Sequence, residues 1–140
     1  MPVPAEYERA SAKFYEFLVA VRDESDLWST HVTYTMVQGV FQTFRRRLTA
    51  QQNLRFADEL PICLRALYVT DWNLDEPNLP FNDLETMNAE VRQLRRQHNF
   101  ATRSAIPDVA KHLWRFVDAE RFENLLEQLP TGAREFWAAD

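Results

Sequence analysis

The chain has 140 residues, of which 46% are hydrophobic, and this is enough apolar material for one compact core without stabilising cross-links. Its formal net charge of −5 disfavours binding to the phosphates of nucleic acids. The two glycines and the single cysteine exclude a phosphate-binding glycine loop, an intramolecular disulfide and a zinc site made of cysteines alone.

Apolar residues at three- and four-residue spacing predict helices throughout the first half of the chain. Thr49 and Gln52 have the spacing of a capping box at a helix start. Pro61 has no amide hydrogen, so it is expected to end one helix and begin the next. The predicted helices cover residues 5–24, 29–48, 49–60 and 61–69. The side chains expected to face inward include Tyr7, Phe17, Met36, Phe44, Leu54 and Tyr68.

Residues 71–80 have the composition of a linker, because they hold two prolines and several Asx residues that favour turns. We expect Trp72 and Leu74 to hold this segment against the surface. Trp72 is also the best candidate for an exposed aromatic anchor in a partner interface. The other tryptophans are expected in the core or at its rim: Trp28, Trp114 and Trp137.

Helical spacing resumes after the linker. Asn82 with Glu85 is predicted to form a capping box, and Ser104 and Asp118 are predicted to be N-caps. Pro130 is expected to break the chain as Pro61 does. The predicted helices cover residues 82–98, 104–117, 118–129 and a short segment after Pro130. The side chains expected to face inward include Leu84, Met87, Val91, Val109, Leu113, Phe122 and Phe136.

The two halves resemble each other when Pro61 is superimposed on Pro130. Thr49 and Asp118 then match as helix caps, and Arg65 matches Arg134. The sequence therefore predicts an all-α fold, a tandem pair of related multi-helix units packed as one compact helical domain. The predicted organisation is a first unit at residues 1–70, a linker at 71–80 and a second unit at 81–140.

The segment around the first proline has a distinctive set of residues: Leu60, Pro61, Leu64, Arg65, Tyr68 and Trp72. With these residues it resembles the bacterial family catalogued as domain of unknown function 2267. The resemblance implies an all-helical fold with tandem halves, and it covers most of the chain. It implies no activity, because that family has no assigned catalytic residues to transfer. The second half departs from the motif at Thr131–Ala133, which replace Ile62–Leu64.

Arg65 and Arg134 are the strongest candidates for a binding or interface role because both halves carry an arginine at this place. A structural role is nevertheless the preferred interpretation, in which each guanidinium bonds a helix-end carbonyl or a carboxylate such as Asp58 or Glu127. In either case the two arginines are expected to have equivalent roles.

Three further features have a structural and a chemical interpretation. Asp108 and His112 could present two metal ligands on one helix face, but a surface charge pair is the preferred interpretation. Cys63 could be an activated thiol, but a buried structural cysteine is preferred. Two groups of arginines could form a nucleic-acid-binding face if they adjoined, although solvated helix faces are preferred. These groups are Arg45, Arg46 and Arg47, and Arg92, Arg95, Arg96 and Arg103.

The sequence thus predicts a non-enzymatic helical domain that binds a protein partner or a second copy of the chain, or serves as a scaffold. No catalytic motif, metal site or cofactor is predicted. The alternatives are a small-ligand or enzymatic pocket between the two units and, more weakly, nucleic-acid binding through the arginines. The absence of a signal-like or membrane-spanning segment predicts a cytoplasmic protein without a membrane partner.

Overall fold

A computed structural model describes residues 3–94 and 101–138, and within these ranges the chain forms helices and no strands. The prediction of an all-α fold is confirmed. No helix in these ranges is both long and apolar enough to cross a bilayer. In chain order the helices are α1 (Ala5–Glu8), α2 (Ala10–Ser25), α3 (Thr30–Arg45), α4 (Ala50–Asp58), α5 (Ile62–Val69), α6 (Leu84–Gln93), α7 (Ala105–Leu113), the short 3-10 helix η1 (Trp114–Phe116), α8 (Ala119–Gln128) and α9 (Ala133–Phe136).

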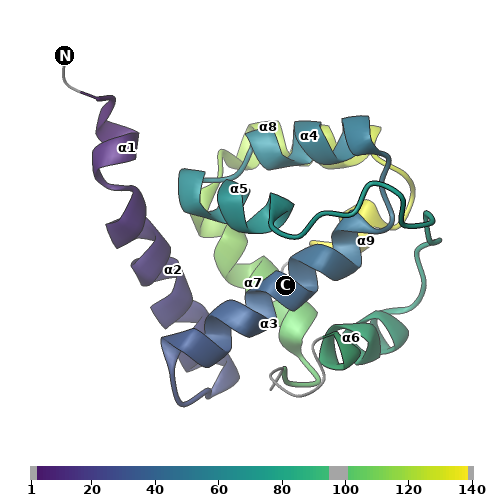
Figure 1. Cartoon of the computed structure of the whole chain (residues 1–140), viewed down its shortest axis with the longest axis horizontal. Coiled ribbons are helices and arrows are strands. Elements are labelled where there is room, and N and C mark those ends of the chain that lie inside the picture. The colour runs from purple at the N-terminus through teal and green to yellow at the C-terminus, as the bar shows by residue number, and fades with distance from the viewer. Residues whose placement is uncertain (1–2, 95–100, 139–140) are drawn as a thin grey trace.

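The N-terminal arm consists of α1 and α2, and its first part extends away from the rest of the chain (Figure 1). The prediction of one continuous helix over residues 5–24 is wrong, because Arg9 leaves helical geometry at φ −101° and ψ 3°. α1 has no buried residue, so packing does not hold it in line with α2. The second part of the arm is anchored by the buried side chains Phe17, Leu18 and Val21.

Helix α3 runs through the centre of the molecule (Figure 1), and most of its residues are buried. Its N-cap is Ser29, whose hydroxyl accepts a hydrogen bond from the amide of Val32 at 3.1 Å. The apolar residues that the sequence assigned to this helix all face the core. Because α3 contacts α2, α5, α6 and α7, it joins the N-terminal and C-terminal parts of the chain.

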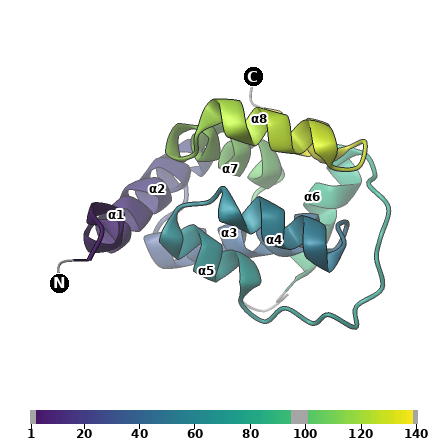
Figure 2. The ribbon, with the colours of Figure 1, turned by 90° about the horizontal axis from the view of Figure 1, so that it is seen from above.

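Helices α4 and α8 start with the predicted caps and lie beside each other (Figure 2). Thr49 and Gln52 form both hydrogen bonds of the capping box, and Asp118 accepts from the amide of Arg121 at 3.1 Å. The late residue Glu59 pairs with the early residue Arg121 at 3.1 Å, so the two helices run antiparallel.

The other predicted caps are confirmed only in part. Asp83, not Asn82, caps α6 by accepting a hydrogen bond from the amide of Thr86 at 2.7 Å. Ser104 stands at the N-cap of α7 but does not cap it with its side chain. Its hydroxyl instead donates to the carboxylate of Asp108 at 2.8 Å. The predicted end of the helix at residue 98 lies outside the described residues.

One continuous core holds the described helices together, and aromatic rings form its centre. Phe44 lies 5.0 Å from Phe136 and 4.7 Å from Phe56, measured between ring centroids. Phe56 stacks on Trp137 at 5.5 Å, with 25° between the ring planes. Because both predicted units supply rings to this cluster, neither buries its apolar surface alone.

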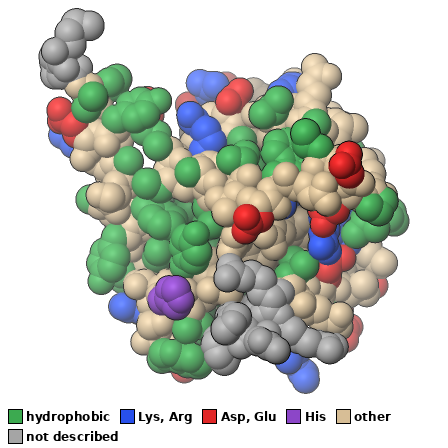
Figure 3. All heavy atoms as spheres, in the orientation of Figure 1, with side chains coloured by type: hydrophobic (Ala, Val, Ile, Leu, Met, Phe, Trp, Pro, Cys, Tyr) green, Lys and Arg blue, Asp and Glu red, His purple; other side chains and the backbone are tan. Residues whose placement is uncertain are grey.

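Several side chains that were expected to face inward are exposed instead. Helical spacing identifies an apolar stripe, but the neighbouring helices decide how wide a stripe is covered. Trp28 was expected at the core and is 70% exposed, in the turn between α2 and α3. Figure 3 shows that hydrophobic side chains also gather over the N-terminal arm. The exposed residues that contradict the predictions are Tyr7, Trp28, Leu54, Leu74 and Leu84.

Candidate functional site

The three candidate residues do not come together in space. Arg65 lines a large groove, whereas Arg134 lies 61% exposed among the carboxylates of α8. Trp72 is half-buried in the linker, with its ring centroid 5.9 Å from the guanidinium carbon of Arg45. The side chain of Trp72 is therefore partly occupied by a contact within the chain.

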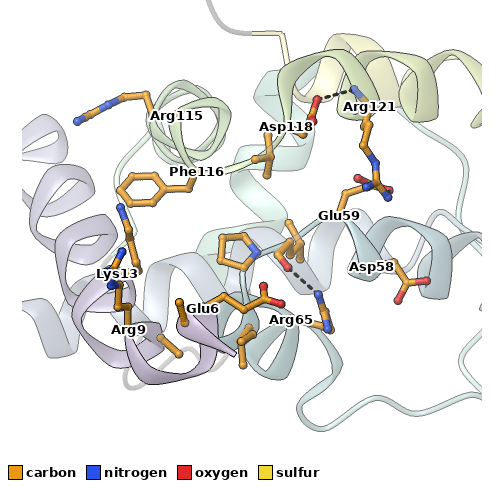
Figure 4. A pocket seen from close by; sticks show the side chains of 16 residues that line it. Glu6, Arg9, Lys13, Asp58, Glu59, Arg65, Arg115, Phe116, Asp118 and Arg121 are labelled. Carbon is orange, nitrogen blue, oxygen red and sulfur yellow. Dashed lines mark hydrogen bonds and ion pairs between the residues drawn. The ribbon is translucent and has the colours of Figure 1, made fainter. Parts of the chain in front are cut away.

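The groove has a volume of about 610 Å³ and lies between three parts of the chain (Figure 4). One wall is the N-terminal arm, the second is the break between α4 and α5, and the third is the junction of η1 with α8. The second wall exists because Pro61 interrupts the helix, and the third exists because Val117 takes up extended geometry before the cap of α8. The lining residues that carry charge are Glu6, Arg9, Lys13, Asp58, Glu59, Arg65, Arg115, Asp118 and Arg121.

Arg65 is fixed at the bottom of the second wall by backbone acceptors. Its guanidinium donates to the carbonyl of Ala57 and to that of Leu60, both at 3.2 Å. These carbonyls belong to the end of α4, where intrahelical partners are missing. The structural interpretation of Arg65 is therefore correct, and the same side chain also faces the groove (Figure 4).

Arg134 has a different structural role from Arg65. Its guanidinium bonds the carboxylate of Glu123 and lies 3.5 Å from that of Glu127. All three side chains are largely exposed, so this network is expected to contribute little to stability. The expectation that the two arginines are equivalent is wrong, because one bonds backbone oxygens and the other bonds surface carboxylates.

An apolar surface separates the two ends of the groove. It is formed mainly by Phe116, Pro61 and Ile62, which are half-buried. The ring of Phe116 packs edge-on against buried Phe17, with 5.5 Å between centroids. The guanidinium carbon of Arg115 lies 5.8 Å from the centroid of the same ring. The groove therefore offers apolar contact next to charge.

Arg45 and Arg47 at the end of α3 are buried and Arg46 is half-buried, which corrects the expectation of a solvated basic face. Arg45 is only 4% exposed and donates to the carbonyls of Tyr68, Thr70 and Asp71 at 2.8, 3.0 and 3.3 Å. It satisfies carbonyls in the last turn of α5 and directly after it, and burial lowers the pKa of its guanidinium. This arginine is therefore not available to a phosphate backbone.

Arg47 is also almost fully buried and attaches the linker to α3. It donates to the carbonyl of Pro80 at 3.0 Å and to both carboxylate oxygens of Glu90 at 2.8 and 3.2 Å. Arg46 pairs with Glu76 of the linker at 3.2 Å. The sequence run of three arginines is thus an attachment point for residues 71–83. In the second arginine group, Arg95 and Arg96 lie outside the described residues.

A buried polar network continues from Arg45. Its carbonyl accepts a hydrogen bond from the amide nitrogen of Asn53 at 3.0 Å, and the phenol of Tyr68 donates to the amide oxygen of Asn53. Burial raises the pKa of Tyr68 well above its ordinary value, so the phenol keeps its proton. These groups satisfy one another and have no access to a substrate.

The predicted pairing of Asp108 with His112 is wrong. Asp108 accepts a hydrogen bond from Ser25 at 2.6 Å, whereas His112 contacts Glu24 at 2.9 Å and Arg115 at 3.1 Å. Both residues thus contribute to the attachment of α7 to neighbouring segments. Because Lys111 and His112 bond its side chain, the pKa of Glu24 lies below its ordinary value.

Cys63 is half-buried, so the expectation of full burial is also wrong. Of the other histidines, His31 is exposed and His98 lies outside the described residues. Within the described ranges no three His, Cys, Asp or Glu side chains are close enough to hold a metal ion. The prediction that the chain has no cofactor stays a prediction.

Sequence reasoning missed four groove residues: Arg9, Lys13, Arg115 and Phe116. One signal was available, because Arg9 and Lys13 have the spacing of neighbours on one helical face. Nothing in the sequence placed them opposite Arg115, which is distant along the chain. Their proximity to one groove depends on how the arm packs against α7.

A comparison with protein-family models matches residues 14–136 to the family described as "Uncharacterized conserved protein (DUF2267)". A search of curated proteins finds no match. The match covers both predicted units and begins after the first part of the N-terminal arm. It confirms the resemblance that the segment around Pro61 indicated. The chain therefore belongs to the DUF2267 family of uncharacterised conserved proteins.

Proposed function

We propose that the chain is a non-enzymatic protein-binding domain whose groove holds a segment of a partner protein. The observation that carries this proposal is the groove of about 610 Å³ between the N-terminal arm, the α4–α5 break and the η1–α8 junction. Walls from three separate elements can contact a bound segment from several sides, which favours specific recognition.

A small-ligand pocket is the second candidate, because the groove volume lies within the range of about 300–1,000 Å³ that small-molecule sites have. Such sites are lined mainly by apolar side chains with few polar groups. This groove has nine charged side chains among its sixteen lining residues. The lining therefore favours a partner that is itself polar and extended.

Selection of displayed random peptides tests the proposed function. The target is the wild-type chain, and the groove is blocked with Ala10→Trp, because Ala10 is a small half-buried residue in the groove wall. The matched control is Ala66→Trp, at an exposed position of α5 that does not line the groove. Circular dichroism checks that both variants are folded.

We expect peptides that bind the wild type and Ala66→Trp but not Ala10→Trp. Peptides that bind Ala10→Trp as well as the wild type, or the absence of any enriched peptide, would contradict the proposal. If instead a small molecule binds the groove and no peptide does, the second candidate replaces the first.

We also propose that the chain arose by duplication of one helical unit, with equivalent segments at residues 1–70 and 81–140 joined by the linker at 71–80. Support comes from the caps Thr49 and Asp118, which begin helices of 9 and 10 residues. The prolines Pro61 and Pro130 then stand before the short helices α5 and α9. The antiparallel packing of α4 with α8 is typical of two related units around an approximate two-fold axis.

We propose the cytoplasm of a bacterium as the location of the protein. The single cysteine supports a reducing compartment, because extracellular domains of this size more often carry disulfides. A second copy of the chain is the alternative partner, and the exposed apolar side chains of the arm support it. Light scattering across a concentration series distinguishes self-association from a constant monomer.

A further inference from the structure

We propose that the groove recognises a carboxylate-rich segment of its partner, bound by Arg9, Lys13 and Arg115 beside the ring of Phe116. This inference rests on the proposed protein-binding function and adds the chemical class of the bound segment. Its basis is the difference in charge compensation between the two ends of the groove.

The three cations at the Phe116 end have no short carboxylate partner within the described part of the chain. Lys13 lies 3.9 Å from the nearest oxygen of Glu16, and both side chains are more than half exposed. Arg115 donates to Nδ1 of His112 at 3.1 Å and has no carboxylate within 4 Å among the described residues, so its charge lacks a counterion. These cations can therefore gain ion pairs from an incoming segment.

The positions of the three cations favour one binding surface. Arg9 and Lys13 are four residues apart and share a face of the arm. Arg115 comes from η1 on the other side of Phe116 (Figure 4). A carboxylate placed over this end is within reach of two elements, so it also bridges the arm and the body of the chain.

At the opposite end of the groove the arginine donors are already engaged, and carboxylates are present. Arg121 pairs with Glu59 at 3.1 Å, and the guanidinium of Arg65 donates to two carbonyls at the end of α4, which hold it in place without neutralising its charge. Asp58 and Glu6 also line the groove, and within the described ranges neither has a basic partner within 4 Å. The groove thus has an electrostatic direction, with uncompensated cations at one end and uncompensated carboxylates towards the other.

This direction favours a polypeptide over a nucleic acid. A phosphate backbone carries charge of one sign along its whole length, so it would meet the carboxylates of Glu6 and Asp58 as well as the cations. A polypeptide can place acidic side chains at the cationic end and an apolar one over Phe116 and Ile62. Charge complementarity of this kind sets the orientation of a partner and its rate of binding.

The recognition surface combines residues inside and outside the family match. Arg9 and Lys13 precede residue 14, where the match to the family model begins, whereas Arg115 and Phe116 lie within it. The preference for carboxylates is therefore assigned to this chain and its arm, not to the family as a whole.

Three synthetic peptides test the inference by fluorescence anisotropy. Each has a central leucine–phenylalanine pair, flanked by glutamate in the first peptide, by glutamine in the second and by lysine in the third. The test variant is Arg9→Glu with Lys13→Glu. The control is Arg55→Glu with Arg92→Glu, which makes the same change in net charge at exposed positions outside the groove. A short DNA duplex is the fourth probe.

We expect the glutamate peptide to bind the wild type most tightly and to lose about tenfold or more in affinity in the groove variant. The control variant is expected to lose less than about threefold, and binding of the glutamate peptide should weaken as salt is added.

Equal binding of the three peptides, or an equal loss in both variants, overturns the inference about carboxylates. The proposed function then still stands if binding is blocked by Ala10→Trp, so the two failures are distinguishable. Tighter binding of the duplex than of the glutamate peptide also overturns the inference.

Discussion

Arginines at the two ends of the molecule have opposite environments. At the end of α3, Arg45 and Arg47 are 4% and 6% exposed; the terminal nitrogens of Arg45 donate to backbone carbonyls, and Arg47 donates to backbone carbonyls and to Glu90. In the groove, Arg9 and Arg115 lie at the surface, without a carboxylate partner in the described ranges. This difference shows that the partners of a cationic side chain, and not the presence of that side chain in the sequence, decide whether it stabilises the fold or is available for binding.

Substitution of Arg45 by methionine is expected to have the largest effect, because it leaves carbonyls at the end of α5, those of Tyr68 and Thr70, without this donor. We expect a loss of about 3 kcal/mol or more in the free energy of unfolding, measured by urea denaturation. Arg46→Met is the matched control, since Arg46 is more exposed, and its loss should be below about 1 kcal/mol. Equal losses in both variants would remove the contrast between buried and exposed arginines.

Gly132→Ala tests the packing of the linker against the C-terminal segment. Gly132 has φ +108°, and an added Cβ would lie 2.7 Å from the Cβ of Phe81. We expect a loss of about 2 kcal/mol or more, measured by thermal and urea denaturation. The double variant with Phe81→Gly should lose less than the two single variants together, because removing both the Cβ and the ring of Phe81 relieves the clash while the backbone strain at position 132 stays. Additive losses would show that the contact with Phe81 does not matter.

Arg65→Ala is expected to have an intermediate effect, because its half-buried guanidinium bonds two carbonyls at the end of α4. We expect a loss of about 1–2 kcal/mol by urea denaturation. Arg134→Ala, at the matching place in the second half, should change stability by less than about 0.5 kcal/mol because its partners are exposed. A larger effect at Arg134 than at Arg65 would reverse the roles inferred for the pair.

Asp83→Ala should give a smaller effect that depends on pH. The hydrogen bond from the amide of Thr86 lowers the pKa of the Asp83 carboxyl in the folded chain, so its contribution is present above the unfolded pKa and is lost as pH falls through the folded pKa. We expect the stability difference from the wild type to be largest near neutral pH and to shrink in acid. Asp83→Asn, which keeps a capping side chain, should show little of this pH dependence. A difference that grows in acid would refute the assigned direction.

The substitutions Arg9→Ala and Lys13→Ala should have the smallest effect on stability. Both side chains are exposed and neither has a short ion pair, so we expect changes within about 0.5 kcal/mol by thermal denaturation. The same variants are expected to weaken binding of the glutamate peptide. If either substitution unfolds the chain, the groove cations stabilise the fold as Arg45 and Arg47 do. The contrast between the buried arginines and the groove cations then fails.

Local features of the sequence determined the helices, the capping box at Thr49, the cap at Asp118 and the break at Pro61. These features depend on side chains within a few residues of one another, so their geometry is encoded locally. The burial of the central aromatic residues was also predictable from helical spacing.

Tertiary structure alone decided which arginines are buried and where the groove lies. A long side chain reaches partners from whichever element packs beside it, and for Arg45 those partners follow α5. The exposure of Leu54 and Trp28 was likewise decided by the absence of a covering helix in the described chain. Spacing along the sequence carries no information about such contacts, because the chain must first bring distant segments together.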